Sequence, residues 1–309
     1  MTFTGLYVPL VTPFTADGDL AADALEALAH EVLDAGAAGL VALGTTGEPA
    51  TLTADEQARV IDICANVCRE RAAALIIGAG SNATIDSARS LTALDPRATA
   101  ALAVVPYYTR PSEAGVVEHF RTLAAASPVP LLIYHIPYRT ALTLGADTLL
   151  RLAELPNVAG FKYTAGGIDD TTIAFMSRLP DHTSVLAGDD LYAAPLLALG
   201  ASGAILACAN VAPAAYADLI AAWRKGELAS GRELGNRLAP LAAALFTEPN
   251  PVVVKAVLAA QGRIPSSAVR LPLLPASDGS LSAAAAAIAA DVAAAIAAAK
   301  VTTDLVRAG

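Results

Sequence analysis

The chain has 309 residues, a formal net charge of −9 at pH 7 and an isoelectric point near 4.9. This negative charge argues against nucleic acid or an acidic membrane surface as a partner, because both present phosphate anions. Apolar residues make up 55% of the chain, which is enough to bury a sizeable core. The first residues lack a basic segment followed by an apolar stretch, so we expect no signal peptide and a cytoplasmic protein.

Short apolar runs recur along the first two thirds of the chain, as is typical of strands that are buried on both faces. They predict eight strands, at residues 5–11, 39–43, 74–78, 101–105, 130–134, 158–162, 184–187 and 203–207. Between these runs, apolar residues recur at i, i+3 and i+4, which is the spacing of an amphipathic helix. This spacing predicts helices at residues 21–35, 53–71, 86–94, 113–126, 145–154, 170–179 and 190–199.

The alternation of apolar strands with helices predicts an α/β fold with a parallel sheet covered by helices. Eight such units fit a (β/α)8 TIM barrel better than an open doubly wound sheet. No Gly-x-Gly-x-x-Gly segment opens a helix after the first strand, which argues against a dinucleotide-binding fold. Strand signals stop near Trp223. We therefore expect the barrel in residues 1–224 and a C-terminal helical region in residues 225–309, with helices at residues 225–246, 251–261 and 283–305.

The remaining composition signals are structural. Residues 283–299 are rich in alanine, but they include Asp291 and few large apolar side chains, which predicts a packed helix rather than a membrane span. Cys64 and Cys68 are four residues apart in a predicted helix, and no further His or Cys lies close in sequence. We interpret them as buried packing thiols, and we expect neither a disulfide framework nor a metal site.

Lys162 is one of only four lysines, and it ends the apolar run of the sixth predicted strand. Burial disfavours a charged ammonium group and lowers its pKa. A neutral lysine amine is a nucleophile that forms Schiff bases with carbonyl substrates. The alternative at this point is a lysine whose charged end reaches solvent from a strand end.

Polar and aromatic clusters follow other predicted strands, and the active site of a barrel lies at the carboxyl ends of its strands. These clusters are residues 44–48, 106–111, 134–140 and 188–190. The turn at residues 44–48 offers amide groups and two hydroxyls that suit a carboxylate. Tyr134 is suited to proton transfer beside Lys162. Arg139 offers a planar fork for a second carboxylate, whereas strand alternation should point His135 away from the mouth, in a structural role.

Several motifs together resemble the dihydrodipicolinate synthase / N-acetylneuraminate lyase family of pyruvate-dependent class I aldolases. They are Gly44-Thr-Thr-Gly-Glu48, Pro106-Tyr-Tyr-Thr-Arg-Pro111, Tyr134-x-x-Pro137 and Gly160-Phe-Lys162, extended by residues 188–190, 209–211 and 248–251. The resemblance covers nearly the whole chain. It implies a (β/α)8 barrel with C-terminal helices, small-molecule substrates and a homotetramer built from dimers. We expect no cofactor and no metal ion.

The resemblance also implies catalytic roles for four residues. Lys162 resembles the lysine that condenses with pyruvate, and Tyr134 resembles the tyrosine that relays protons there. Thr45 is similar to the threonine that links this tyrosine to a second one, which the neighbouring subunit contributes. Tyr108 is at the position of that second tyrosine.

Further residues are expected to bind substrate. Thr46, together with Thr45, resembles the pair that takes up the pyruvate carboxylate, and Ile205 is expected to place a backbone carbonyl near the imine. Gly188, in the motif at residues 188–190, is a further substrate-binding candidate. Arg139 lies five residues after Tyr134, as does the arginine of the synthase branch that binds the carboxylate of aspartate semialdehyde.

Three bulky or unusual residues depart from the synthase pattern. They are His135, Tyr138 and Tyr163, and we expect the two tyrosines to rim the pocket of the second substrate. The resemblance favours condensation of pyruvate with aspartate semialdehyde. The alternatives are an aldolase or dehydratase that acts on a 2-keto-3-deoxy sugar acid or on 4-hydroxy-2-oxoglutarate, and a non-catalytic protein that binds keto acids.

Overall fold

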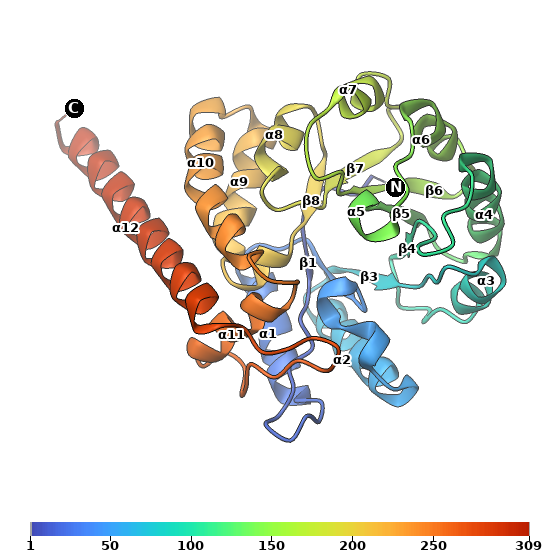
Figure 1. Ribbon diagram of the computed structural model, residues 1–309. Helices are drawn as coiled ribbons and strands as arrows, with labels where there is room; N and C mark the ends of the chain where they lie inside the picture. Colours follow the sequence, from blue (N-terminus) through green and yellow to red (C-terminus); the bar gives the residue numbers. More distant parts are fainter. Residues whose placement is uncertain (1, 309) are drawn as a thin grey trace.

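The computed structural model describes residues 2–308, and side chains are described through residue 295. Eight parallel strands close into a barrel in the order of the chain (Figure 1). They are β1 (Gly5–Pro9), β2 (Gly39–Ala42), β3 (Ala74–Gly78), β4 (Ala100–Val104), β5 (Leu131–His135), β6 (Val158–Tyr163), β7 (Ser184–Ala187) and β8 (Gly203–Ile205). The predicted (β/α)8 barrel is confirmed, and each strand begins and ends within two residues of its predicted bounds.

Helices lie in the connections between the strands, and most of them cover the outside of the barrel (Figure 1). They are α1 (Ala22–Asp34), α2 (Ala54–Glu70), α3 (Thr84–Thr92), α4 (Glu113–Ala126), α5 (Pro137–Thr140), α6 (Ala146–Ala153), α7 (Asp170–Met176), α8 (Ala193–Ala198) and α9 (Pro213–Lys225), with short 3-10 turns η1 (Thr45–Gly47), η2 (Pro49–Thr51) and η3 (Ala207–Asn210). Helix α9 was not predicted from the sequence. Pro213 at its first position and the spacing of Tyr216 and Ile220 on its buried face are nevertheless typical of a helix.

Three helices form the C-terminal region. They are α10 (Leu228–Leu245), α11 (Val252–Ala260) and α12 (Asp278–Ala308). The predicted helix start at Lys225 is wrong, because Lys225 ends α9 and Gly226 caps that helix in the left-handed conformation. Helix α12 packs against α10 and α11 and begins five residues before the prediction. The domain boundary at residue 224 stays a prediction, and the outermost residues of the two ranges, 1 and 309, lie outside the described residues.

Apolar side chains form two layers on either side of the barrel wall. The larger layer lies between the strands and the helices, and it contains Phe161 and Tyr163 of β6. The smaller layer fills the barrel itself, and it contains Leu132 and Tyr134 of β5 and Ile205 of β8. Because side chains alternate along a strand, each barrel strand supplies both layers. The smaller layer therefore forms the apolar floor beneath the mouth of the barrel.

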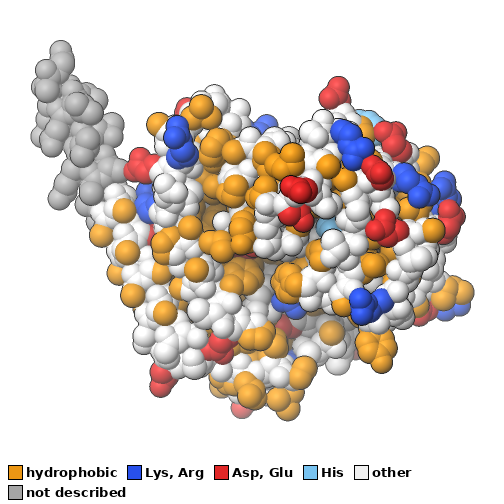
Figure 2. All heavy atoms as spheres, turned by 45° about the horizontal axis from the view of Figure 1, so that its top comes forward, with side chains coloured by type: hydrophobic (Ala, Val, Ile, Leu, Met, Phe, Trp, Pro, Cys, Tyr) orange, Lys and Arg blue, Asp and Glu red, His pale blue; other side chains and the backbone are white. Residues whose placement is uncertain are grey.

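The composition also led to expectations about membrane spans, the cysteines and the surface charge. In the part of the chain that the structure describes, no helix has the length and apolar character needed to cross a membrane. Cys64 and Cys68 are buried on α2, as predicted, and are free thiols. Figure 2 shows Lys and Arg side chains interspersed with Asp and Glu over the face in view, so this face has no broad basic patch.

Candidate active site

A cavity opens at the carboxyl ends of the strands. It is lined by Thr45, Thr46, Tyr134, Tyr138, Arg139, Lys162, Gly188, Asp190, Ala207, Phe246 and Asn250. Six of these are residues that the sequence assigned to the site, and they come from the ends of β5, β6 and β7 and from the turn after β2. Among the side chains that the structure describes, no group of three His, Cys, Asp or Glu is arranged to hold a metal ion.

The pairing of β5 with β6 places the two central side chains of the site together. Tyr134 and Lys162 are direct partners in the parallel ladder. Both strands direct these side chains into the barrel, where Lys162 Nζ lies 4.2 Å from the centre of the Tyr134 ring. The amine therefore lies against an aromatic face within reach of the barrel mouth, rather than extending into solvent.

This pairing depends on a one-residue irregularity in the ladder. Leu131 pairs with Val158, but Leu132 pairs with Gly160, so β6 has one extra residue at this point. If the register of Leu131 and Val158 continued without this shift, Phe161 would lie opposite Tyr134 and the lysine would point out of the barrel. Gly160 permits the close approach of the neighbouring strand, because a Cβ atom there would collide with the carbonyl oxygen of Ser184.

The environment of Lys162 favours the neutral amine. The side chain is 5% exposed, and burial lowers its pKa from 10.5 to about 8. The positive charge of Arg139 also lowers this pKa, whereas the carboxylate of Asp190 raises it. Desolvation is the largest of these effects. The predicted desolvated lysine is thus present, and its alternative, a solvated strand-end lysine, is excluded.

Tyr134 remains protonated near neutral pH. Burial raises its pKa to about 12, although the charge of Arg139 and a hydrogen bond with the Thr45 side chain oppose this shift. A phenol that keeps its proton can donate it to an oxygen atom bound near Lys162. The Thr45 side chain contacts the Tyr134 hydroxyl, and its role in relaying that proton stays a prediction.

The turn after β2 lies at the edge of the same cavity. Its 3-10 geometry is closed by the amides of Gly47 and Glu48, which donate to the carbonyl oxygens of Gly44 and Thr45 at 2.9 and 3.2 Å. The amides of Thr45 and Thr46 begin the short helix and have no intrahelical acceptor. The buried Thr46 hydroxyl accepts a hydrogen bond of 2.9 Å from Asn250 Nδ2. This acceptance leaves the hydroxyl proton of Thr46 available to a carboxylate in the cavity.

Arg139 lies on the short helix α5, at the exposed rim of the cavity. Its Nε donates to the Tyr138 hydroxyl at 3.1 Å, and its guanidinium carbon lies 5.3 Å from the centre of the Tyr138 ring. Tyr138 therefore rims the cavity, as predicted, and orients the arginine. The two terminal nitrogens of Arg139 remain the part that can bind a carboxylate in a bidentate manner.

The sequence-based interpretation did not single out four cavity residues, which are Asp190, Ala207, Phe246 and Asn250. Asp190 is buried, accepts a 2.7 Å hydrogen bond from the Cys208 amide, and has a pKa that burial raises to about 6. Asn250 contacts Thr46, and Phe246 closes the side formed by the C-terminal region. Asp190 and Asn250 do belong to motifs that the family resemblance quoted, at residues 188–190 and 248–251. Those motifs were the available signal.

The structure separates other candidates from the cavity of this chain. Tyr163 does not rim the pocket, so that prediction is wrong: its ring is buried outside the barrel, stacked on Phe175, and its hydroxyl bonds to Thr172. His135 also points outward and packs against Tyr163, as strand alternation predicted.

Ile205 ends β8 inside the barrel floor. Tyr108 is 89% exposed and does not line the cavity.

A comparison with known proteins decides the family. The model of the dihydrodipicolinate synthetase family matches residues 2–291. The chain belongs to this family. It is 39% identical over 285 residues to the 4-hydroxy-tetrahydrodipicolinate synthase of Neisseria meningitidis serogroup B, which covers 92% of this chain and 97% of that protein. The enzyme of the same name from Salinibacter ruber is 40% identical over 282 residues, covering 91% of this chain and 92% of the relative.

Solved structures of the family have the same fold. The chloride-inhibited dihydrodipicolinate synthase of Acinetobacter baumannii, whose structure was determined in complex with pyruvate, superimposes with a TM-score of 0.89 at 35% identity. The match covers 94% of this chain and 99% of that one. The family resemblance inferred from the motifs is therefore confirmed along the length of the chain.

Gly188 provides a test of the packing around Lys162. A Cβ atom at this position would lie 2.7 Å from Lys162 Cγ and 2.9 Å from Cε, and it would collide with the Thr164 hydroxyl. We expect Gly188→Ala to displace the amine and to slow turnover about 100-fold, the scale of a 1 Å misplacement. Gly167→Ala is the matched control, because no heavy atom lies within 4 Å of its added Cβ. Equal turnover of the two variants would contradict this packing role.

Proposed function

We propose that the protein is a 4-hydroxy-tetrahydrodipicolinate synthase, a lyase of the class I aldolase type that condenses pyruvate with aspartate semialdehyde. The observation that carries this proposal is the buried amine of Lys162, with a pKa lowered to about 8, in contact with the ring of Tyr134. The name shared by relatives that match nearly the whole chain supports the same reaction.

In the first half of the reaction, the neutral amine of Lys162 attacks the keto carbon of pyruvate. The turn at Thr45 and Thr46 holds the pyruvate carboxylate, which fixes the keto carbon at the end of β6. Loss of water from the resulting carbinolamine requires a proton on the departing oxygen. Tyr134 supplies that proton, and the product is an imine between Lys162 and pyruvate.

In the second half, the imine loses a methyl proton and becomes an enamine, which attacks the aldehyde carbon of the second substrate. Arg139 binds the carboxylate of that substrate at the rim of the cavity. The amine of the semialdehyde then displaces Lys162, which closes the ring and frees the enzyme. Because Tyr163 lies outside the pocket, Tyr138 is the one of the three departures from the synthase pattern that lines it.

Arg139 discriminates between the two substrates. We expect Arg139→Lys to raise the KM for aspartate semialdehyde about tenfold or more, because hydrogen bonds to charged groups contribute about 1.5–3 kcal/mol and lysine lacks the planar fork. The KM for pyruvate should change little. Steady-state kinetics with each substrate varied in turn measure both values, and Arg121→Lys, an exposed arginine of α4, is the control.

The same assay tests the proposed function directly. The parent protein should consume pyruvate and aspartate semialdehyde together. No turnover of the semialdehyde, with turnover of a 2-keto-3-deoxy sugar acid or of 4-hydroxy-2-oxoglutarate instead, would replace the proposal by the alternative aldolase.

We propose further that Tyr108 acts in the cavity of a neighbouring subunit of a cytoplasmic homotetramer. Its side chain is 89% exposed, and Tyr107 and Ile85 are large apolar residues that are also exposed. The backbone of Tyr108 has φ +68°, a conformation that costs free energy in a residue other than glycine and persists where the surroundings require it. An exposed tyrosine held in this way is suited to insertion into a partner.

Subunit exchange tests this role. A mixture of Lys162→Ala and Tyr108→Phe chains contains hybrid dimers in which one of the two cavities has both an intact lysine and an intact tyrosine. For random exchange in a symmetric dimer, about a quarter of the cavities are then intact. We expect activity above the mean of the two separate variants. Mixing Lys162→Ala with a Lys162→Ala/Tyr108→Phe chain should restore none, and the same absence in the first mixture would contradict the role.

A further inference from the structure

Glu48, the last residue of the turn motif, has no place in the reaction described above. It follows Thr45 and Thr46 directly, but its side chain points away from the cavity and is 1% exposed. Its backbone has φ 53° and ψ 40°, the left-handed conformation, and it joins η1 to η2. A residue other than glycine keeps such a conformation only where the surrounding structure fixes it. The groups that fix Glu48 therefore also fix the end of the turn.

Two groups from the C-terminal region hold the Glu48 carboxylate. Lys255, on α11, donates from Nζ to Oε1 at 2.7 Å, and both side chains are fully buried, at 0% and 1% exposed. The backbone amide of Arg270 donates to Oε2 at 3.0 Å. Lys255 Nζ also lies 4.0 Å from the centre of the Phe14 ring. The buried ammonium group of Lys255 therefore lies between the Glu48 carboxylate and the face of the Phe14 ring.

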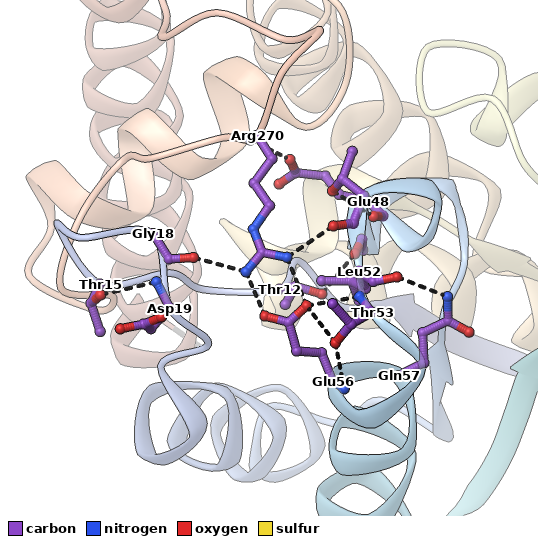
Figure 3. Close-up of polar contacts among 12 residues, drawn as sticks. Thr12, Thr15, Gly18, Asp19, Glu48, Leu52, Thr53, Glu56, Gln57 and Arg270 are labelled. Atoms are coloured by element: carbon purple, nitrogen blue, oxygen red, sulfur yellow. Dashed lines mark hydrogen bonds and ion pairs between the residues drawn. The ribbon is translucent and has the colours of Figure 1, made fainter.

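The guanidinium of Arg270 extends this contact to the following helix (Figure 3). It donates to both carboxylate oxygens of Glu56, and it also donates to the carbonyl oxygens of Thr51 and Gly18, at 2.9 and 2.8 Å. Glu56 in turn forms the capping box of α2 with Thr53. The segment from Glu48 to the start of α2 is therefore attached to the C-terminal region along its whole length.

We propose that Lys255 is a positioning residue for substrate binding: through the buried Glu48 carboxylate, it holds the Thr45–Thr46 turn in the geometry that receives the carboxylate of pyruvate. This inference rests on the proposed function. Lys255 does not line the cavity, so it acts only through Glu48. The hydroxyl of Thr46 is held from the same region by Asn250, at the start of the segment that leads into α11.

The chemistry of the pair explains why it can fix a strained turn. A hydrogen bond between two ionised groups is short and strong, and a fully buried charge that loses its ionic partner is costly. Moving Glu48 away from Lys255 would leave two unpaired charges in the interior. The left-handed backbone at Glu48, and with it the amides and hydroxyls of the turn, is therefore restricted to one arrangement.

Lys255→Met tests the proposal, because methionine fills similar space without the charge. We expect the KM for pyruvate to rise about tenfold, equivalent to about 1.4 kcal/mol, with kcat within about threefold of the parent, as for an interaction that binds the ground state and transition state alike. The KM for aspartate semialdehyde should stay near the parent value. Leu258→Ala, which removes core packing from the same helix, should lower the melting temperature without changing either KM.

The double variant Glu48→Gln/Lys255→Met separates positioning from stability. Neutralising both partners removes the unpaired buried charge, so we expect the melting temperature to recover relative to Lys255→Met while the KM for pyruvate stays raised. A KM that returns to the parent value together with the melting temperature, or that never changes in Lys255→Met, would overturn the positioning role. Turnover by the parent protein tests the proposed function separately, so the two can fail independently.

Discussion

Lys162 lies one residue before the end of β6, where burial removes the water that would otherwise solvate its ammonium group. This desolvation lowers its pKa from 10.5 to about 8 against the opposing charge of Asp190. At pH 7, about one amine in ten is then neutral, roughly 300-fold more than at the ordinary pKa. The roles proposed for the other site residues depend on this condition, because a proton from Tyr134 and a carboxylate bound at the turn serve the reaction only when a nucleophile is present.

Two structural features that take no part in the proposed reaction position Lys162 and the turn after β2 at the same cavity. The extra residue in β6 aligns Lys162 with Tyr134 in the ladder and puts Phe161 into the outer layer. On the other side of the mouth, the C-terminal region holds the turn through Lys255 and Asn250. In the proposed reaction, the barrel therefore positions the amine, and the C-terminal helices position the turn that receives the substrate anion.

The sequence predicted the barrel because its strands are apolar on both faces and its helices have a clear periodicity. The sequence placed Lys162, Tyr134 and Arg139 in the candidate site because residues at the carboxyl ends of barrel strands lie together at the barrel mouth. It could not predict the irregularity in β6, since a one-residue change of register leaves no local pattern. Tyr163 was placed at the pocket rim, although strand alternation counted from Lys162, as it was counted from Tyr134 to His135, places it in the outer layer. The Glu48–Lys255 pair joins residues 207 positions apart, which local spacing does not reveal.

The most direct test of the account is the pH dependence of imine formation on Lys162. Pyruvate and borohydride would be added over a range of pH, and the trapped adduct would be followed by intact mass and located by peptide mapping. Because the neutral amine is the reacting form, the account predicts one pyruvyl adduct, at Lys162, whose rate of formation rises to half its maximum near pH 8. An adduct at Lys225, Lys255 or Lys300, or a midpoint near the ordinary lysine pKa of 10.5, would contradict it.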